Sequence, residues 1–255
     1  MKKRLSIALA VALLTAGGAD AYLGQIEASF RSPAGADTRG MARAAGYLYV
    51  VDGTDPGVIY RMNPDTGKVY DWYVVGWDGI NSGLAFSTPS YLWVGCVSNN
   101  VVYQTRAFTG SVYSSWDAGH DPFGCAPRST GDGGKGTTHF FTTDNMPDFM
   151  FTHRWNGNII NSFPLGTRSR FDCAYDWRNN LLWRGDANYV YAHTPTGSIA
   201  ASFPSPAGSP RGLAYNNSRL WIGCTDDSYI YRVHCPKNFF AVEPASVGRV
   251  KALFR

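Results

Sequence analysis

Short runs of aromatic and β-branched residues follow one another along most of the chain, and glycine turns separate them. The run at 47–51 reads Y-L-Y-V-V and the run at 229–232 reads Y-I-Y-R, which is the composition of half-buried strands. Turn sequences stand between such runs, for example D-T-G at 65–67 and P-T-G at 195–197. The pattern therefore predicts an all-β chain built from short strands.

A four-residue segment recurs five times along the chain. It reads R-G-M-A, S-G-L-A, F-G-C-A, F-D-C-A and R-G-L-A, and the copies end at Ala42, Ala85, Ala126, Ala174 and Ala214. The intervals between these alanines are 43, 41, 48 and 40 residues, and the glycine-rich loop at 131–137 accounts for the longest. A period near forty made of short strands is typical of a β-propeller. We therefore predict a five-bladed β-propeller with four-stranded antiparallel blades.

The last repeat lacks its own outer strand, and the missing strand stands at the start of the chain. Residues 24–35 closely match residues 197–208, which carry the outer strand of the fourth repeat. We expect the N-terminal strand to pair into the last blade, which closes the ring and leaves no unpaired edge at the seam. The expected divisions are a closing strand at 22–38 and blades at 39–81, 82–122, 123–170, 171–210 and 211–238.

The two ends of the chain are expected to lie outside the propeller. A basic start at 2–4 precedes an apolar stretch at 5–14, and A-D-A at 19–21 fits a signal-peptide cleavage site. Cleavage near Ala21-Tyr22 would release a secreted or periplasmic, soluble protein. The tail at 239–255 is apolar with basic punctuation; it either packs on the last blade or adds a strand to a partner or a second copy. The candidate partner-binding residues are Phe239, Phe240, Val250, Leu253 and Phe254.

Charge and hydropathy exclude two classes of function. Without residues 1–21 the formal charge falls from +4 to +2, and lysines and arginines do not cluster, so nucleic-acid binding has no electrostatic basis. No segment after residue 21 has the apolar run that a transmembrane helix needs. Aromatic residues make up 15% of the chain, which suits tightly packed sheets and also carbohydrate-binding surfaces.

The five cysteines are expected to be thiols. Cys125 and Cys173 share one repeat position on adjacent blades, where the other blades carry Met41, Leu84 and Leu213. Equivalent side chains point the same way around the ring, so the two cysteines should not face each other closely enough for a disulfide. We predict that both are buried and fill a leucine-sized site. The chain has no C-x-x-C or Cys/His spacing typical of zinc sites.

Polar residues are expected to gather at one mouth of the central channel. In a propeller, the connections that enter the inner strands lie on the same face as those that follow the second strands, so their side chains surround one concave opening. The candidate ligand-binding residues there are Arg39, Asp52, Trp77, His120, Asp144, Arg170, Asp186 and Arg211. No cofactor is predicted, although a divalent cation could bind among the carboxylates.

A simpler interpretation of this mouth is local turn chemistry. Aspartates are turn residues, and they could cap the connections and pair with nearby arginines without forming a ligand site. His153 and His193 occupy one repeat position beside a strand aromatic, where blades 1 and 5 carry Met62 and Val233, so packing is their expected role. The loop at 131–137 lacks the G-K-[ST] ending of a phosphate-binding loop.

The repeat pattern resembles the streptogramin-lyase-like, NHL and YVTN propellers. The segment 39–69 carries it most fully, with G-M-A, Y-L-Y-V and I-Y-R-M-N-P-D-T-G-K-V in order. The resemblance implies the propeller fold, and for a lyase it would imply a metal-held glutamate and histidine acid/base chemistry. After residue 21 the chain has only Glu27 and Glu243, both away from the expected mouth, so those catalytic residues cannot be carried over.

Three functions compete at this point. The leading one is an exported, non-catalytic module that binds a ligand or a partner, such as a protein or glycan outside the cell. The second is a structural protein that assembles with copies of itself through blade edges and the tail. The third is a hydrolase or lyase that uses channel aspartates for acid/base work. Blade residues alone do not decide among them, because one fold hosts many functions.

Overall fold

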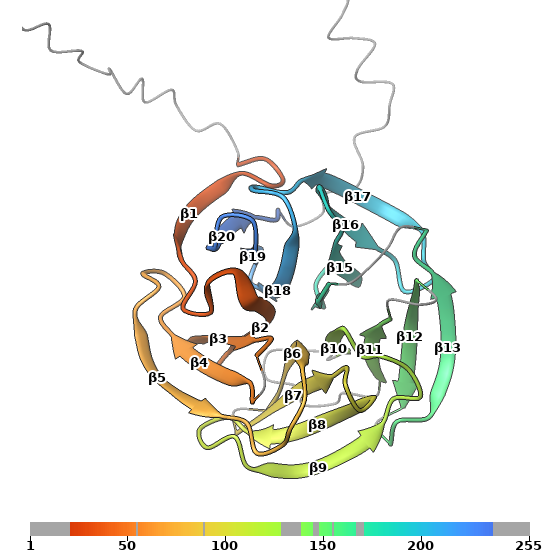
Figure 1. Cartoon of the computed structure of the whole chain (residues 1–255). Coiled ribbons are helices and arrows are strands. Elements are labelled where there is room, and N and C mark those ends of the chain that lie inside the picture. Colours follow the sequence, from red (N-terminus) through yellow and green to blue (C-terminus); the bar gives the residue numbers. More distant parts are fainter. Residues whose placement is uncertain are drawn as a thin grey trace, which may run out of the picture.

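Twenty strands form five four-stranded antiparallel sheets arranged around a central axis in the described part of the chain (Figure 1). The computed structural model describes residues 21–54, 56–88, 90–128, 139–144, 148–154, 156–166 and 171–236, with the side chains of 87 and 88 excepted. The sequence prediction of a five-bladed propeller is confirmed. The expected signal peptide (apart from Ala21), the tail and the loop at 131–137 lie outside the described residues.

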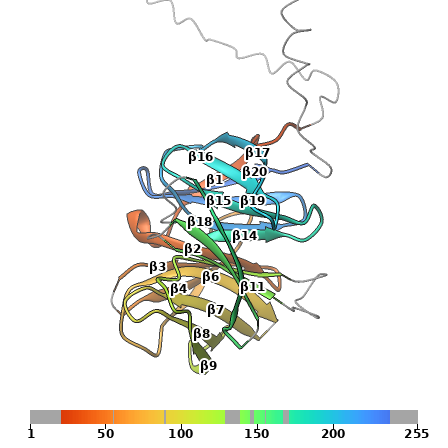
Figure 2. The same cartoon turned by 90° about the vertical axis from the view of Figure 1, so that its right-hand side faces the viewer.

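Each blade runs from an inner strand at the axis to an outer strand at the rim. Blade 1 holds β2 (Thr38–Ala44), β3 (Tyr47–Asp52), β4 (Val58–Met62) and β5 (Val69–Val74). Blade 2 holds β6 (Asn81–Thr88), β7 (Tyr91–Cys96), β8 (Val101–Arg106) and β9 (Val112–Asp117). Blade 3 holds β10 (Gly124–Arg128), β11 (His139–Thr143), β12 (Phe149–Arg154) and β13 (Ile159–Pro164). The side view places inner strands β2, β6, β14 and β18 in the middle and outer strands β9 and β17 at opposite edges (Figure 2).

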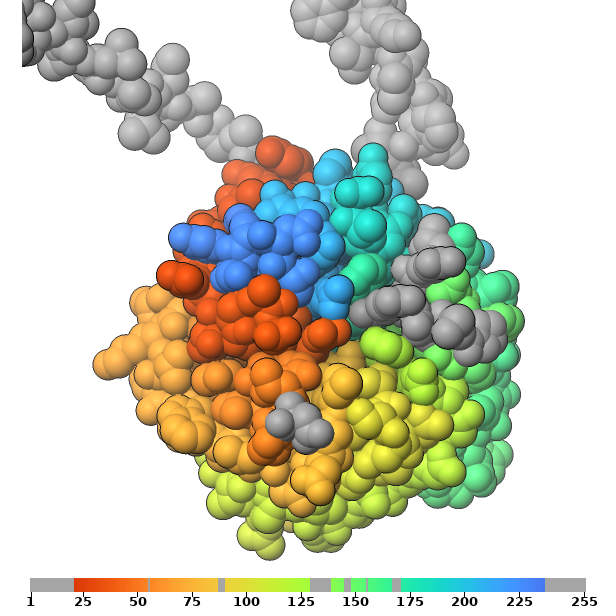
Figure 3. Space-filling model, viewed as in Figure 1, coloured from red at the N-terminus to blue at the C-terminus, as the bar shows by residue number. Residues whose placement is uncertain are grey.

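Blades 4 and 5 complete the ring, and the last one is shared between the two ends of the chain. Blade 4 holds β14 (Cys173–Asp176), β15 (Leu181–Gly185), β16 (Tyr189–His193) and β17 (Ile199–Pro204). Blade 5 holds β18 (Pro210–Asn216), β19 (Arg219–Cys224), β20 (Tyr229–His234) and, as its outer strand, β1 (Ile26–Arg31). N-terminal and C-terminal residues therefore lie side by side on the surface (Figure 3).

Pairing between β1 and β20 closes the ring as the sequence match predicts. The register places Arg31 opposite Tyr229 and Ile26 opposite Val233. Glu27 of β1 adds a charged contact, because its carboxylate lies 2.8 Å from Arg219 Nε and 3.1 Å from Arg232 Nε. The seam is thus held by a hydrogen-bonded ladder and an ion-pair cluster.

The recurring alanine has a packing reason. Each one lies directly opposite an aromatic residue of the second strand, and all ten residues are buried. The pairs are Ala42–Tyr49, Ala85–Trp93, Ala126–Phe141, Ala174–Trp183 and Ala214–Trp221. A small residue beside a large ring lets adjacent blades pack at the crowded axis, and the rings supply much of the buried apolar surface.

The glycine of the recurring segment allows the inner strands to approach one another. A Cβ on Gly40 would lie 2.2 Å from the Ser82 carbonyl oxygen, and a Cβ on Gly83 would lie 2.6 Å from the Cys125 nitrogen. A side chain directed that way would push adjacent strands apart. The ring therefore needs glycine at this position wherever neighbouring backbones touch.

The cysteines lie where the repeat predicts them. All five cysteines are buried and free, and Cys125 and Cys173 occupy the leucine-like core positions that the repeat predicts. In the part of the chain that the structure describes, no helix is long and apolar enough to cross a membrane.

Candidate functional site in the central channel

Two aspartates of the predicted mouth cap their own turns. Asp52 Oδ1 accepts hydrogen bonds from Thr54 Oγ1 and the Val58 N–H, both at 2.8 Å. Asp186 Oδ1 accepts from the N–H groups of Asn188 and Tyr189, both at 2.9 Å. These bonds satisfy turn donors after the second strands of blades 1 and 4. The geometry is that of the local turn interpretation.

Trp77 and His120 link neighbouring blades by stacking. Trp77 lies on Tyr103 with ring centroids 4.3 Å apart, and His120 lies on Phe151 at 4.2 Å. Trp77 Nε1 also donates to Asn81 Oδ1 at 2.8 Å. In both cases a residue that follows an outer strand covers the third strand of the next blade. Packing between blades therefore accounts for the position of both side chains.

A buried polar chain runs from His120 into blade 3. His153 Nδ1 donates to the Gly157 carbonyl at 2.9 Å, so in the neutral ring Nε2 accepts from Thr142 Oγ1 at 2.8 Å. His120 Nε2 lies 2.9 Å from the same hydroxyl, and its Nδ1 lies 3.7 Å from Asp144 Oδ2. Burial lowers the pKa of His120 and lowers that of His153 to about 4. All four side chains are buried, so this row of polar groups is not open to a substrate.

The three predicted arginines do not share one environment. Arg39 packs on the turn after β3, where a Cβ on Gly53 would lie 2.5 Å from its Nε. The Arg211 carbonyl accepts the Asp172 N–H at 2.8 Å, and its side chain is half-buried. Arg170 lies outside the described residues. The central channel contains a cavity, and none of the predicted mouth residues in the described part of the chain lines it.

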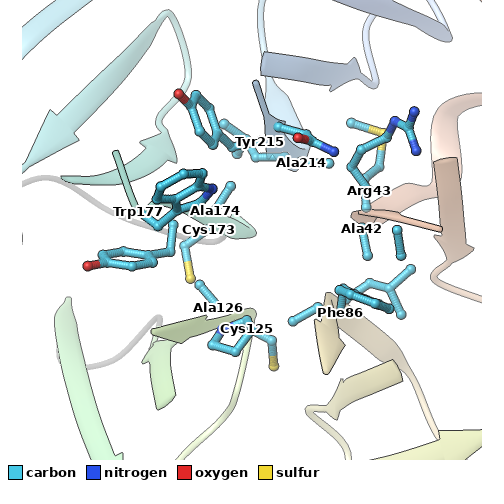
Figure 4. Close-up of a pocket in the computed structure, with 18 of the residues that line it drawn as sticks. Ala42, Arg43, Phe86, Cys125, Ala126, Cys173, Ala174, Trp177, Ala214 and Tyr215 are labelled. Carbon is cyan, nitrogen blue, oxygen red and sulfur yellow. The ribbon is translucent and has the colours of Figure 1, made fainter. Parts of the chain in front are cut away.

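That cavity occupies the central channel and opens toward the turns that join inner to second strands. Its volume is about 390 Å³, within the usual range of small-molecule sites. Figure 4 shows the inner strands of several blades around an open centre, with alanines and cysteines close to it. Its lining follows the repeat, so each blade contributes the same consecutive positions of its inner strand.

The lining has three layers, which follow one another along the channel from its deep end to its opening. The deepest, here called the inner layer, is apolar: Met41, Leu84, Cys125, Cys173 and Leu213. The middle layer is the ring of recurring alanines: Ala42, Ala85, Ala126, Ala174 and Ala214. The outer layer and rim are larger and more polar: Arg43, Ala44, Ala45, Phe86, Pro127, Tyr175, Trp177, Tyr215, Asn216 and Asn217. The cavity therefore passes from a hydrocarbon interior to a rim that can make hydrogen bonds.

Arg43 is the cationic group of the rim. Its Nη1 donates to the Tyr47 carbonyl at 3.0 Å, and its guanidinium lies 5.6 Å from the centre of the Trp221 ring. Its Nε is buried and makes no hydrogen bond within the described part of the chain. Burial lowers the pKa of this guanidinium, but arginine remains charged. A half-buried cation with a buried, free Nε donor favours a hydrogen-bond acceptor nearby.

Asp172 closes the other end of the channel. Its Oδ2 accepts the N–H groups of Met41 at 2.8 Å and Leu213 at 3.2 Å, and its Oδ1 accepts that of Cys125 at 3.2 Å. The Cys173 N–H is a fourth donor. The side chain is fully buried. Burial raises the pKa of this carboxyl well above its usual range, and the four donors act in the opposite direction.

The ionisable groups of the described cavity lining are Arg43, two cysteine thiols and two tyrosine phenols. Burial raises the pKa of the Cys125 and Cys173 thiols, which keeps them protonated and weakly nucleophilic. The described lining residues include no histidine, aspartate or glutamate to transfer protons. The described residues also contain no group of three or more side chains able to hold a metal ion.

Sequence reasoning missed both the face of the cavity and Asp172. The signal for Asp172 was present, because it is the single non-glycine among the residues that precede the inner-layer positions: Gly40, Gly83, Gly124, Asp172 and Gly212. The cavity lining had no comparable signal. Its alanines, leucines and cysteines are the same residues that define the repeat.

Comparison with known proteins supports the fold. No protein-family profile matches the chain, and no curated protein sequence matches it. Among solved structures, glutaminyl cyclase from Myxococcus xanthus aligns with a TM-score of 0.65 and 11% identity over 83% of this chain and 95% of that one. Virginiamycin B lyase from Staphylococcus aureus aligns with a TM-score of 0.49 and 16% identity over 77% and 66%. The alignment with glutaminyl cyclase, at 11% identity, shows a similarity of fold.

Proposed function

We propose that this protein is a non-catalytic module that binds a small ligand in the central cavity. The observation that carries the proposal is a channel of about 390 Å³ that is closed at one end, apolar inside and polar at its rim. Such a gradient is characteristic of sites that bury the body of a ligand and orient it by a few polar contacts.

Backbone groups add to the polar contacts that a ligand would find. The inner strands β2, β6, β10, β14 and β18 are each the edge of their sheet. In an antiparallel strand the N–H and C=O of one residue point to the same side, so alternate residues of an edge strand direct both groups away from the sheet. Residues that direct their N–H to Asp172 therefore direct their carbonyls toward the channel. The ligand expected here is mainly apolar and carries a few hydrogen-bonding groups.

Export is the second part of the proposal, and it rests on the signal-peptide pattern at 1–21. A ligand or partner such as a glycan or protein would then be met outside the cytoplasm. A divalent cation at the polar mouth stays a sequence prediction. Turnover is not proposed, because the described cavity lining has no histidine, aspartate or glutamate, and burial raises the pKa of its cysteines and tyrosines.

The test is a ligand screen with matched tryptophan variants. Candidate amphipathic small molecules are titrated by calorimetry against the wild type, Trp177→Ala and Trp72→Ala. Trp177 lines the rim, whereas Trp72 is 61% exposed on outer strand β5 and serves as the control. We expect saturable binding that Trp177→Ala weakens at least tenfold and Trp72→Ala leaves unchanged. Binding that Asp186→Asn abolishes and Trp177→Ala spares would place the site at the opposite face and overturn the proposal.

Exposed aromatic residues on two outer strands favour a second candidate, self-association. Trp72 and Tyr70 on β5 are 61% and 48% exposed, and Tyr113 on β9 is 62% exposed. Outer strands also present unpaired backbone groups, which can pair with another chain. The tail residues of the sequence prediction lie outside the described part. Light scattering after size-exclusion chromatography of residues 22–255, 22–236 and the Trp72→Ser variant tests this candidate. A monomer in all three at high concentration rejects it.

A further inference from the structure

The closed end of the channel is a convergence of backbone donors from four blades. Met41 of β2, Cys125 of β10 and Leu213 of β18 direct their N–H groups to the Asp172 carboxyl, at 2.8 to 3.2 Å. Cys173 of β14 supplies the fourth donor. Convergent amide N–H groups form concave sites with a strong preference for negative charge. Within the described part of the chain, the hydrogen bonds to both carboxyl oxygens come from N–H donors, so the backbone favours the ionised form and opposes the burial that raises the pKa of this carboxyl.

The repeat indicates that Asp172 is an addition to this ring of donors and not a requirement of the blade. Four of the five repeats carry glycine at the equivalent position. One aspartate side chain on the axis is enough to accept N–H groups of blades 1, 3, 4 and 5. Its CH₂–COO⁻ group therefore fills a place that the fivefold arrangement would otherwise leave to solvent or to a ligand.

The ring of donors also adjoins the cavity. Met41, Cys125, Cys173 and Leu213 provide the donors and also form most of the inner layer of the cavity lining. A small molecule that enters from the open face would reach these N–H groups if the Asp172 side chain were shorter. A molecule much larger than the aspartate side chain would not fit between the inner strands.

We propose that this ring of N–H groups is a binding site for a small monocarboxylate, occupied in the native chain by the carboxylate of Asp172. The site selects by charge and size. In an Asp172→Gly variant the missing group has the size of acetate, and in Asp172→Ala it has the size of formate. The free anion then takes the place of the side chain and restores the hydrogen bonds that hold four blades together.

The experiment measures thermal unfolding of the wild type, Asp172→Gly, Asp172→Ala and the control Asp186→Gly in acetate, formate or sulfate at equal ionic strength. Asp186 also accepts two backbone N–H groups, but in a solvent-accessible turn. We expect the midpoint of both Asp172 variants to fall on the order of 10 °C. Acetate should recover Asp172→Gly and formate should recover Asp172→Ala, each with saturation, whereas sulfate recovers neither.

The outcome is decisive in either direction, because unfolded variants can be tested as well. If a variant does not fold on its own, its refolding yield from urea is compared with and without its matched anion. Recovery that follows the Gly–acetate and Ala–formate pairing supports the site. Equal responses of all four proteins, or variants that neither anion improves in stability or refolding yield, overturn it.

Discussion

Blades 3 and 4 bury polar pairs at positions where blades 1 and 5 bury hydrocarbon. In blade 3, Thr142 Oγ1 donates to His153 Nε2 at 2.8 Å, and in blade 4, Arg184 Nε donates to His193 Nε2 at 2.9 Å. The equivalent pairs are Val50–Met62 in blade 1 and Ile222–Val233 in blade 5. All eight residues are buried. The same backbone therefore accepts both chemistries at one place.

The difference teaches that a polar pair is tolerated here when each member satisfies the other. Each histidine donates from Nδ1 to a turn carbonyl, that of Gly157 or Gly197, which leaves Nε2 as an acceptor for the second strand. The Arg184 guanidinium has a further acceptor in the Leu165 carbonyl and lies over the Tyr191 ring. Because each donor meets an acceptor, burial does not leave an isolated polar group.

The largest expected effect comes from breaking the pair in blade 4. His193→Val leaves Arg184 Nε buried without its acceptor, and we expect a loss of about 3 kcal/mol in the free energy of unfolding. Adding Arg184→Ile gives blade 4 the residues of blade 5, and the double variant should lie within about 1 kcal/mol of the wild type. Urea denaturation of both single variants and the double variant measures the coupling. Additive losses would show that the two side chains act independently.

The second-largest expected effect is a dependence of stability on acid pH, which should arise from the buried histidines of blades 3 and 4. Burial lowers the pKa of His153 and of His193 to about 4, below the ordinary value of 6.5. The stability from keeping each ring neutral is complete above about pH 6.5 and is lost as pH falls toward 4, by about 2–3 kcal/mol per histidine. The quadruple variant T142V/H153M/R184I/H193V gives both blades hydrocarbon at these positions, as in blades 1 and 5, and should lose this sensitivity. Urea denaturation at pH 7.5 and 4.5 measures it, and an unchanged pH dependence in the variant contradicts the assignment.

A smaller effect is expected in blade 3. Thr142→Val removes a hydroxyl that bonds two histidine rings and keeps the size of the side chain, so His120 and His153 each lose a partner. We expect a loss of about 1–2 kcal/mol in the free energy of unfolding. Val50→Thr in blade 1 is the mirror change and should also destabilise, because Met62 offers no comparable acceptor. Equal stability of Thr142→Val and wild type by urea denaturation would show that the Thr142 hydroxyl does not stabilise blade 3.

The smallest effect should come from the turn-capping aspartates. Asp186→Asn weakens acceptance of two turn N–H groups, and we expect a loss of about 0.5–1 kcal/mol in the free energy of unfolding. Asp52→Asn should cost slightly more, because Asp52 is buried and also accepts from Thr54. Neither change should alter ligand binding in the central cavity. A variant with native stability and lost binding would instead restore the polar mouth as a site.

The fold could be predicted almost completely from the sequence, because the same packing requirements recur in every blade of a propeller. Ala42 and its four equivalents recur since each inner strand meets an aromatic ring, and the match of 24–35 to 197–208 revealed the closing strand. His153 and His193 are buried, as a packing role requires, and each also forms a hydrogen-bonded pair that the sequence did not predict. Local strand chemistry and close packing act at every repeat, so five copies reinforce the signal.

The candidate site was less predictable for a physical reason. Asp52 and Asp186 carry the residue type of a ligand site, yet their short carboxylates reach the nearest turn donors first. Sequence does not distinguish such local capping from convergence across blades. Asp172 behaves in the opposite way, since its partners are 131, 47 and 41 positions away in the chain. Its role follows only from the closed ring.

The seam in blade 5 has a consequence for how the chain reaches this structure. β1 must wait for β20, and their paired residues, such as Ile26 and Val233, are separated by the whole propeller. At about 5–20 residues per second, synthesis separates the two strands by roughly 10–40 s. During that interval β1 has no partner, and once β20 is made, blade 5 keeps an open edge until β1 pairs with it. The last step of folding is therefore the long-range pairing of β1 with β20. Strand β1 of a second copy competes for the same edge, so we expect blade 5 to be the first place where strand exchange between copies occurs.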